Sequence, residues 1–168
     1  EIALAITSAQ KYLPTTLEIM KYHLNNKKNS CIYVTMNKPY VSLIKSLKEN
    51  KISTEKLFVI DAITSENERN QAENAIFIGS PNRLTDISIS TTAAIKNSAS
   101  EGNLLYFDNL STMLIYNEAG SITKFMHFII NKMKESNVVG IILSLEKGTD
   151  DRVISQISQF VDKVVQVV

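Results

Sequence analysis

The sequence has little of what marks a secreted, membrane-spanning or nucleic-acid-binding protein. Its single cysteine, Cys31, excludes a disulfide within the chain, and its place in an apolar run predicts a buried, unreactive thiol. No apolar run approaches the roughly 18 residues that cross a bilayer, and no signal-peptide pattern opens the chain. The net charge of +1 provides no overall field to attract nucleic acid. We therefore expect a cytoplasmic protein that engages neither membranes nor nucleic acid.

The length and composition fit one globular domain. The chain has 168 residues, of which 44% are hydrophobic and 21% charged, which is enough for a sizeable core. No linker, repeat or low-complexity stretch divides it, so we expect a single domain over residues 1–168. The first residue is Glu1, whereas a native start would normally carry Met, which raises the hypothesis that the chain is a piece of a longer protein.

Short apolar runs alternate with amphipathic segments along the whole chain. The runs are rich in Val and Ile and mostly lack strict alternation, which is typical of strands covered on both faces of a parallel sheet. The expected strands cover residues 2–7, 31–36, 57–60, 104–107, 138–145 and 163–168. Apolar residues at helical spacing predict helices at residues 14–27, 40–50, 83–100, 121–136 and 150–161. This order predicts an α/β fold, a three-layer α/β/α sandwich with a mostly parallel, doubly wound sheet.

Two connections do not follow the pattern. Residues 62–82 are long and polar, and their short apolar run at 75–78 is either a brief strand or a loop packed on the core. Residues 109–120 follow a strand without an obvious helix cap. Within them, residues 113–116 are four consecutive apolar residues, which we interpret equally as core or as a contact between subunits.

The turn after the first strand has the outline of a phosphate-binding loop without its chemistry. In the pattern G-x-x-x-x-G-K-[ST], with Thr15 at the hydroxyl position, Ser8 and Leu13 stand in place of the glycines and Pro14 in place of the lysine. Pro14 has neither a cation nor a backbone N–H to offer a phosphate. A simpler interpretation is that Pro14 lies in the first turn of a helix that Thr15 and Glu18 cap.

The whole chain nevertheless resembles the KaiC-like branch of the RecA-fold ATPases. The resemblance rests on "TTLEIMKYHL" after the first strand, "IYVTMNKPY" in the second, "NLLYFDNLSTML" in the strand that would carry the metal-organising Asp, "VGIILSLEKG", and the closing "ISQFVDKVVQV". It covers about residues 2–168, with order and spacing in agreement. It implies a RecA-type α/β core, the fold of P-loop NTPases.

The resemblance also implies where a nucleotide would bind. Ser8, Thr15, Thr16 and Asp108 stand at matching positions, with Thr15 and Asp108 as ligands of the magnesium that accompanies ATP, and Lys11, three residues upstream of the lysine position, is the lysine that would supply the missing charge. The pair that would activate water, acidic in the family, is Asn37–Lys38 here. These side chains cannot take a proton from water at neutral pH.

We therefore expect no catalytic residues and no cofactor. The prediction is a regulatory or scaffolding module, with signalling as its context, that acts through a protein partner or self-association. The alternative is a divergent ATPase that uses Lys11, Thr15 and Asp108 with ATP and Mg²⁺. A nucleic-acid-binding module is a third hypothesis, which the neutral charge disfavours.

Asp108 and the remaining polar candidates have structural interpretations as well. Without a phosphate partner, we expect Asp108 to cap the next turn or to form a hydrogen bond, for example with Thr15. The two histidines lack acidic or cysteine neighbours at metal-ligand spacing. We expect the two arginines outside the long connection, Arg83 and Arg152, to form surface ion pairs.

Overall fold

The computed structural model describes residues 1–65, 72–98 and 102–168. Within these residues, seven strands form one sheet in the order β4-β3-β2-β5-β6-β1-β7, and every neighbouring pair is parallel. The strands are β1 (Ile2–Thr7), β2 (Ser30–Thr35), β3 (Leu57–Asp61), β4 (Ala75–Phe77), β5 (Asn103–Asp108), β6 (Val139–Leu145) and β7 (Lys163–Gln166). The predicted parallel sheet is confirmed, and the apolar run at 75–78 is a strand rather than a loop.

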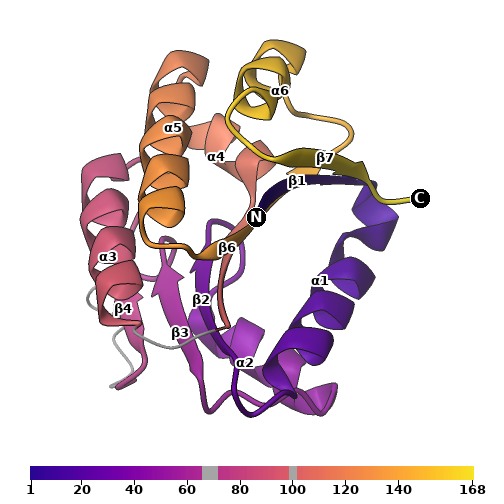
Figure 1. Cartoon of the computed structure of the whole chain (residues 1–168), viewed down its shortest axis with the longest axis vertical. Helices are drawn as coiled ribbons and strands as arrows, with labels where there is room; N and C mark the ends of the chain where they lie inside the picture. The colour runs from indigo at the N-terminus through magenta and orange to yellow at the C-terminus, as the bar shows by residue number, and fades with distance from the viewer. Residues whose placement is uncertain (66–71, 99–101) are drawn as a thin grey trace.

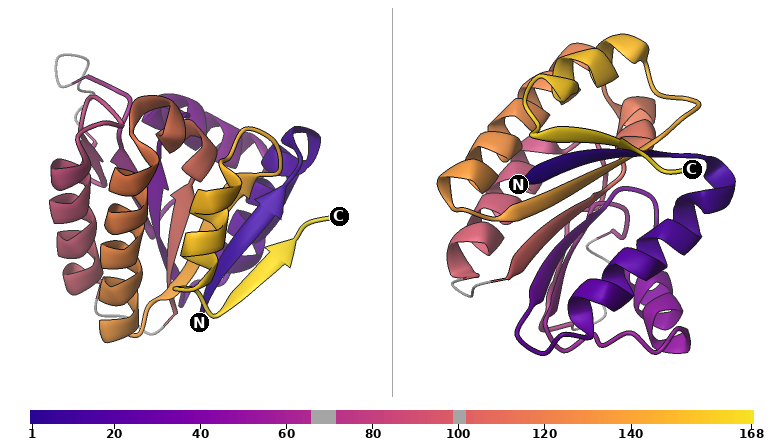
Figure 2. Two further views of the ribbon diagram at one scale, coloured as in Figure 1. Left: turned by 90° about the horizontal axis from the view of Figure 1, so that it is seen from above. Right: turned by 45° about the vertical axis from the view of Figure 1, so that its right-hand side comes forward.

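Helices cover both faces of the sheet, which confirms the three-layer sandwich (Figures 1 and 2). One face carries α1 (Ala9–Leu24) and α2 (Tyr40–Glu49). The other face carries α3 (Leu84–Asn97), α4 (Leu110–Tyr116), α5 (Ala119–Glu135) and α6 (Asp151–Ser158). Among the described residues, no helix combines the length and the apolar character needed to cross a membrane.

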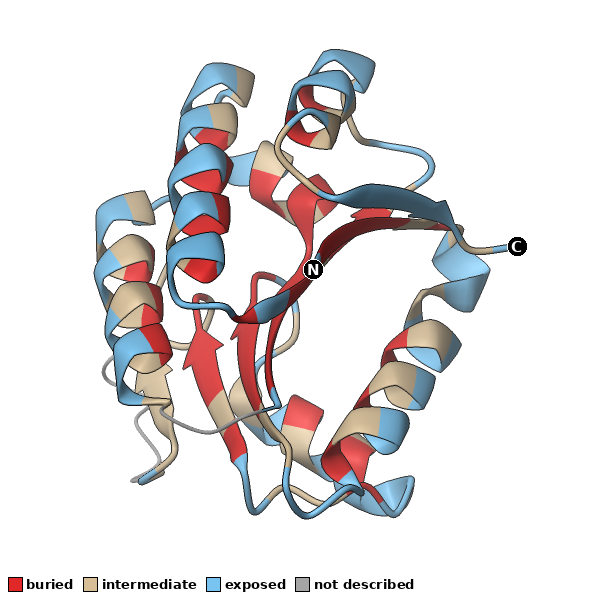
Figure 3. Cartoon of the chain, in the orientation of Figure 1, coloured by how far each residue is buried: buried red, intermediate tan, exposed pale blue. Residues whose placement is uncertain are grey.

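Alternation along the strands divides the core into two clusters. On β5, Leu105 and Phe107 pack under α3 to α6, whereas Leu104 and Tyr106 pack under α1 and α2. Both faces of the central strands are buried (Figure 3). This explains why their sequences are continuous apolar runs.

The first helix begins five residues earlier than predicted. It starts at Ala9, directly after Ser8, so that Pro14 lies inside it rather than in its first turn. Pro14 cannot donate to the carbonyl of Gln10, but both residues are exposed, and water can satisfy that carbonyl. The expected cap by Thr15 and Glu18 is therefore wrong.

Helix α4 was not predicted, because its start signal is a single residue. The side chain of Asn109 accepts a hydrogen bond from the backbone N–H of Thr112 at 2.9 Å and caps this seven-residue helix. Met113 is buried, whereas Ile115 and Tyr116 are 76% and 50% exposed. The apolar run at 113–116 is thus divided between core and surface.

Candidate functional site

The candidate site lies at the carboxyl ends of the central strands, where open α/β sheets place their ligands. Asp108 is the last residue of β5, and in the parallel register its neighbour is Thr35, the last residue of β2. Tyr33 and Tyr106 are partners two residues earlier. Because side chains alternate along a strand, all four lie on the face covered by α1 and α2.

A network of hydroxyl groups surrounds the Asp108 carboxylate. The Tyr12 hydroxyl, from α1, lies 2.5 and 2.6 Å from the two carboxylate oxygens, to which it donates its hydrogen bond. The Tyr33 hydroxyl donates to Oδ2, and the Asn109 amide donates to Oδ1 at 3.2 Å. Both oxygens of Asp108 are therefore engaged by protein donors.

Burial controls the protonation of this network. Desolvation is the largest effect on Asp108 and raises the pKa of its carboxyl, while the hydrogen bonds from Tyr12, Tyr33 and Asn109 lower that pKa in part. Desolvation, followed by the nearby Asp108 charge, raises the pKa of Tyr12, Tyr33 and Tyr106 well above the ordinary tyrosine value. The three tyrosines therefore stay protonated at neutral pH, and Tyr12 and Tyr33 act as donors to the carboxylate, whereas the Tyr106 hydroxyl bonds to that of Thr16.

The early start of α1 brings Tyr12 to this position. The N–H groups of Lys11 and Tyr12 donate to the Ser8 carbonyl at 3.1 and 3.0 Å. The helix continues without interruption to Leu24. From Tyr12 to Thr16, every backbone N–H donates to a carbonyl four residues earlier in the chain, and Pro14 has none to donate. This segment therefore offers no N–H groups to a phosphate.

The structure brings together only part of the predicted nucleotide-binding set. Asp108 is fully buried, and Thr16 is buried with its hydroxyl 2.8 Å from the hydroxyl of Tyr106, in the same network. Ser8 precedes α1 as its N-cap residue, but its side chain forms no capping bond. Lys11 is exposed, and Thr15 is half-buried.

The expected hydrogen-bonding role of Asp108 is confirmed, whereas the capping alternative and the suggested partner, Thr15, are wrong. Asn109, not Asp108, caps the following helix, since the carboxylate of Asp108 points to the other side of the sheet. Its partners are Tyr12 and Tyr33 rather than Thr15. On α1 it is Thr16, the next residue, that faces the sheet and is buried, while Thr15 is only half-buried.

Asn37 and Lys38 adjoin the same network. The Asn37 amide donates to the Tyr12 hydroxyl at 3.2 Å. The Lys38 charge slightly lowers the pKa of Asp108. The backbone N–H of Lys38 donates to Thr35 Oγ1, and Thr35 Oγ1 donates back to the Lys38 carbonyl, so the turn after β2 is held closed.

Sequence reasoning missed the three tyrosines that define the site. Tyr33 and Tyr106 lie inside the apolar runs that predict the strands at 31–36 and 104–107. The available signal was a tyrosine two residues before Asp108 on the same face, since a buried tyrosine hydroxyl requires a hydrogen-bond partner. Tyr12 had no such signal, because its role depends on where α1 begins.

The other polar candidates have structural partners. His23 Nε2 lies 2.9 Å from the Ser30 carbonyl, and His127 stacks on Phe160. In the described part of the chain, no three His, Cys, Asp or Glu side chains are grouped so as to hold a metal ion. Cys31 is buried, as predicted, and burial raises the pKa of its thiol.

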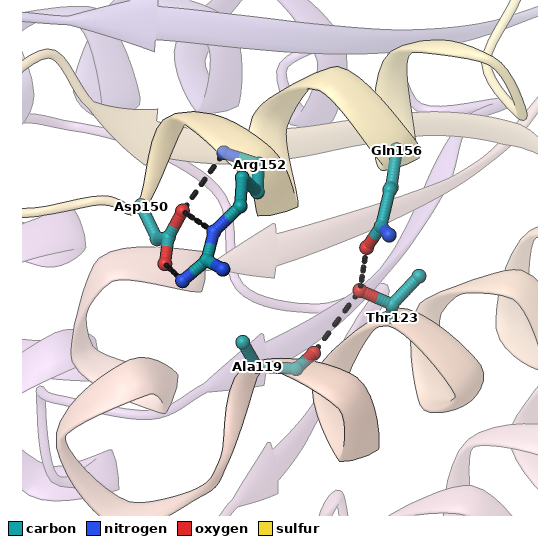
Figure 4. Close-up of polar contacts among 5 residues, drawn as sticks. All are labelled: Ala119, Thr123, Asp150, Arg152 and Gln156. Carbon is teal, nitrogen blue, oxygen red and sulfur yellow. Dashed lines mark hydrogen bonds and ion pairs between the residues drawn. The ribbon is translucent and has the colours of Figure 1, made fainter.

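The two arginines form the surface ion pairs that the sequence predicts. Arg83 pairs with Asp86 at 2.8 Å. Arg152 pairs with Asp150 at 3.2 Å, at the start of α6. Beside this pair, the Thr123 hydroxyl donates to Gln156 and joins α5 to α6 (Figure 4). Both arginines are thus engaged in stabilising local structure.

Comparison with known proteins identifies a family and a fold. Residues 25–167 match the model of a family described as a family of unknown function (DUF7504). None of the curated proteins matches the chain. The KaiC-like protein PH0186 from the hyperthermophilic archaeon Pyrococcus horikoshii OT3 superposes with a TM-score of 0.71, at 10% identity, over 98% of this chain and 69% of that one. The PH0250 protein of the same organism superposes with a TM-score of 0.66, at 10% identity, over 100% of this chain and 82% of that one. The predicted KaiC-like, RecA-type fold is confirmed.

We predict that Tyr12→Phe lowers the free energy of unfolding by about 1–3 kcal/mol, because the buried Asp108 carboxylate loses a donor. Urea denaturation at pH 7 measures the change. Tyr22→Phe is the matched control, since Tyr22 lies on the same helix and is 89% exposed. Equal stability of the two variants would contradict the assigned role of Tyr12.

We also predict that Asp108→Asn removes a pH dependence of stability. Because burial raises the pKa of Asp108, the folded state binds more protons than the unfolded state from about pH 4 up to the folded-state pKa. Stability of the natural protein therefore falls with rising pH in that window, and the variant should gain relative to it.

Urea denaturation at several values between pH 4 and pH 8 measures this difference. Thr16→Val is the control, because it alters the same network without removing a titrating group and should shift stability by a pH-independent amount. Parallel curves for Asp108→Asn and the natural protein would refute the prediction.

Proposed function

The chain belongs to the family of unknown function DUF7504, and we propose that it is a non-catalytic KaiC-like module that regulates or scaffolds other proteins. The observation that carries this proposal is the contact between Tyr12 and Asp108. In a KaiC-like ATPase, the segment around Tyr12 would form the phosphate loop and Asp108 would organise the magnesium ion. Here the two side chains bond to each other instead.

The residues at these positions do not fit magnesium and a triphosphate. A phosphate cradle requires several free backbone N–H groups directed at one point, together with a lysine. Here the corresponding segment is helical from Ala9, and Pro14 has no N–H. A cation approaching Asp108 from the α1 side would have to displace the Tyr12 hydroxyl. The phosphate loop is thus degraded in this proposal, and we assign no catalytic residue.

The water-activating position supports the same proposal. Asn37, which stands where the KaiC-like ATPases carry an acid, donates its amide to the Tyr12 hydroxyl instead of accepting a proton. Phosphoryl transfer depends on charges positioned around the phosphates. The hydroxyl network around Asp108 supplies hydrogen bonds that stabilise the fold, and its function is structural.

A regulatory or scaffolding role requires a surface for a partner, and we propose self-association through α4. Ile115 and Tyr116 are exposed at its carboxyl end, while Met113 anchors the helix in the core. Exposed apolar side chains on a rigid element are suited to contact between subunits. A cytoplasmic location and a signalling context are part of this proposal.

We predict that the purified protein shows no binding of ATP that depends on Mg²⁺, Lys11 or Asp108 in isothermal titration calorimetry, and that it releases no phosphate above the buffer rate. The physical reason is that the N–H groups from Lys11 onward are used within α1 and that protein donors engage both oxygens of Asp108. Lys11→Ala should behave identically. Binding that Lys11→Ala abolishes, or hydrolysis that Asp108→Asn abolishes, would refute the proposal and favour a divergent ATPase that uses Lys11, Thr15 and Asp108.

We predict that the double variant Ile115→Ser/Tyr116→Ser sediments as a smaller species than the natural protein at the same concentration. Sedimentation velocity over a range of concentrations measures this change. The control is Tyr22→Ser/Ile89→Ser, which removes one exposed tyrosine and one exposed isoleucine from α1 and α3. A natural protein that is monomeric throughout, or an equal effect of the control, would exclude self-association through α4.

A further inference from the structure

A pocket of about 670 Å³ lies at the amino ends of β2 and β3, at the sheet edge opposite to Asp108. Two turns form it, one between α1 and β2 and the other between α2 and β3. Its polar lining consists mainly of Asn25, Lys27, Asn29, Lys51, Ser53 and Lys56. Glu55 adds one acidic side chain, so the lining carries three positive charges and one negative charge.

The three lysines of the pocket are Lys27, Lys51 and Lys56. Within the described ranges, no carboxylate lies within ion-pair distance of Lys27, Lys51 or Lys56. Elsewhere on the surface, lysines do form such pairs, namely Lys45 with Glu49, Lys132 with Glu135, and Lys163 with Glu1. All three pocket lysines are exposed, so their ammonium groups remain available to an anion.

The net charge of the whole chain does not reveal how much positive charge surrounds the pocket. Residues 21–56 contain eight of the eighteen basic residues and only two of the seventeen acidic ones. This segment therefore carries a net charge of +6, in a chain whose total is +1. It comprises the last turn of α1, strand β2, helix α2 and both turns of the pocket. A local positive field of this kind raises the concentration of anions at the pocket.

The backbone of the two turns is held in place. The Asn25 amide donates to the Lys51 carbonyl at 3.4 Å, and the Ser53 backbone N–H donates to Asn25 Oδ1 at 3.1 Å, which joins one turn to the other. Lys51 has a φ of 56° and donates its N–H to the Lys48 carbonyl at 3.0 Å. The pocket is therefore built before a ligand arrives, which lowers the entropy lost on binding.

We propose that this pocket binds a small molecule that carries several phosphate groups. Lysine ammonium groups neutralise phosphate as point charges, and the Asn and Ser side chains can complete the hydrogen bonds of the phosphate oxygens. None of the residues that line the pocket is aromatic. A stacking surface for bases is thus missing, which favours a small phosphorylated ligand over single-stranded nucleic acid. The site is separate from the Asp108 network and independent of the function proposed for it.

The experiment is calorimetric titration with sodium tripolyphosphate at low ionic strength. The natural protein should bind it, and the variant Lys27→Gln/Lys51→Asn/Lys56→Gln should bind at least roughly tenfold more weakly, because each lysine supplies a charge-assisted hydrogen bond. Asn is chosen at position 51 because it tolerates the left-handed conformation found there.

The matched control is Lys96→Gln/Lys124→Gln/Lys147→Gln, which removes the same number of charges from exposed positions outside the basic segment. It should keep nearly the affinity of the natural protein. The single variant Lys27→Gln, in an exposed turn, should give a smaller loss and tests the proposal if the triple variant folds poorly.

Three results would overturn the proposal. The first is no binding of tripolyphosphate to the natural protein. The second is an equal loss in the pocket variant and the control, which would indicate general charge attraction. The third is tighter binding of a thymidine oligonucleotide than of tripolyphosphate, with an affinity that falls steeply as salt rises, which would assign the pocket to nucleic acid.

Discussion

The buried carboxylate of Asp108 is the constraint on which the carboxyl edge of the sheet depends. Removing a carboxylate from water is costly unless donors replace the lost hydration. Here the donors come from α1, from β2 and from the turn after β5, through Tyr12, Tyr33 and Asn109. One carboxylate thus links α1 and β2, which lie far from it in the sequence, to the end of β5.

This constraint also explains why the region is closed rather than open. In a parallel α/β sheet the carboxyl edge is the usual place for a ligand, because the loops that follow the strands can form a crevice there. In this protein the loop after β1 is reduced to Ser8, and the helix that follows brings Tyr12 over Asp108. Side chains of the protein itself satisfy the polar groups at the edge. The basic pocket lies at the other edge, where Lys27, Lys51 and Lys56 form no ion pair with the residues that the structure describes.

The elements that the sequence predicted well are those whose signal is local. Buried strands such as β1 and β6 follow from short runs rich in apolar residues, and α5 follows from Ile122, Phe125 and Met126 at helical spacing. The start of α1 was wrong, because proline in a helical pattern usually marks a first turn and the exposure of Pro14 and Gln10 has no sequence signal. Helix α4 was missed because its seven residues are too few for a clear period and Asn109 alone caps it.

Local patterns along the chain were sufficient for the α/β class, for the two-faced burial of the strands and for the resemblance to KaiC-like proteins, because each depends on residue types at short spacing. They were also sufficient to predict that the turn after the first strand cannot bind phosphate in the usual way, because Pro14 and the lack of glycines are visible in the sequence. The strand order, the tyrosines around Asp108 and the gathering of Lys27, Lys51 and Lys56 arise only when distant segments pack together. Long-range packing selects those neighbours, and no spacing within a single segment encodes them.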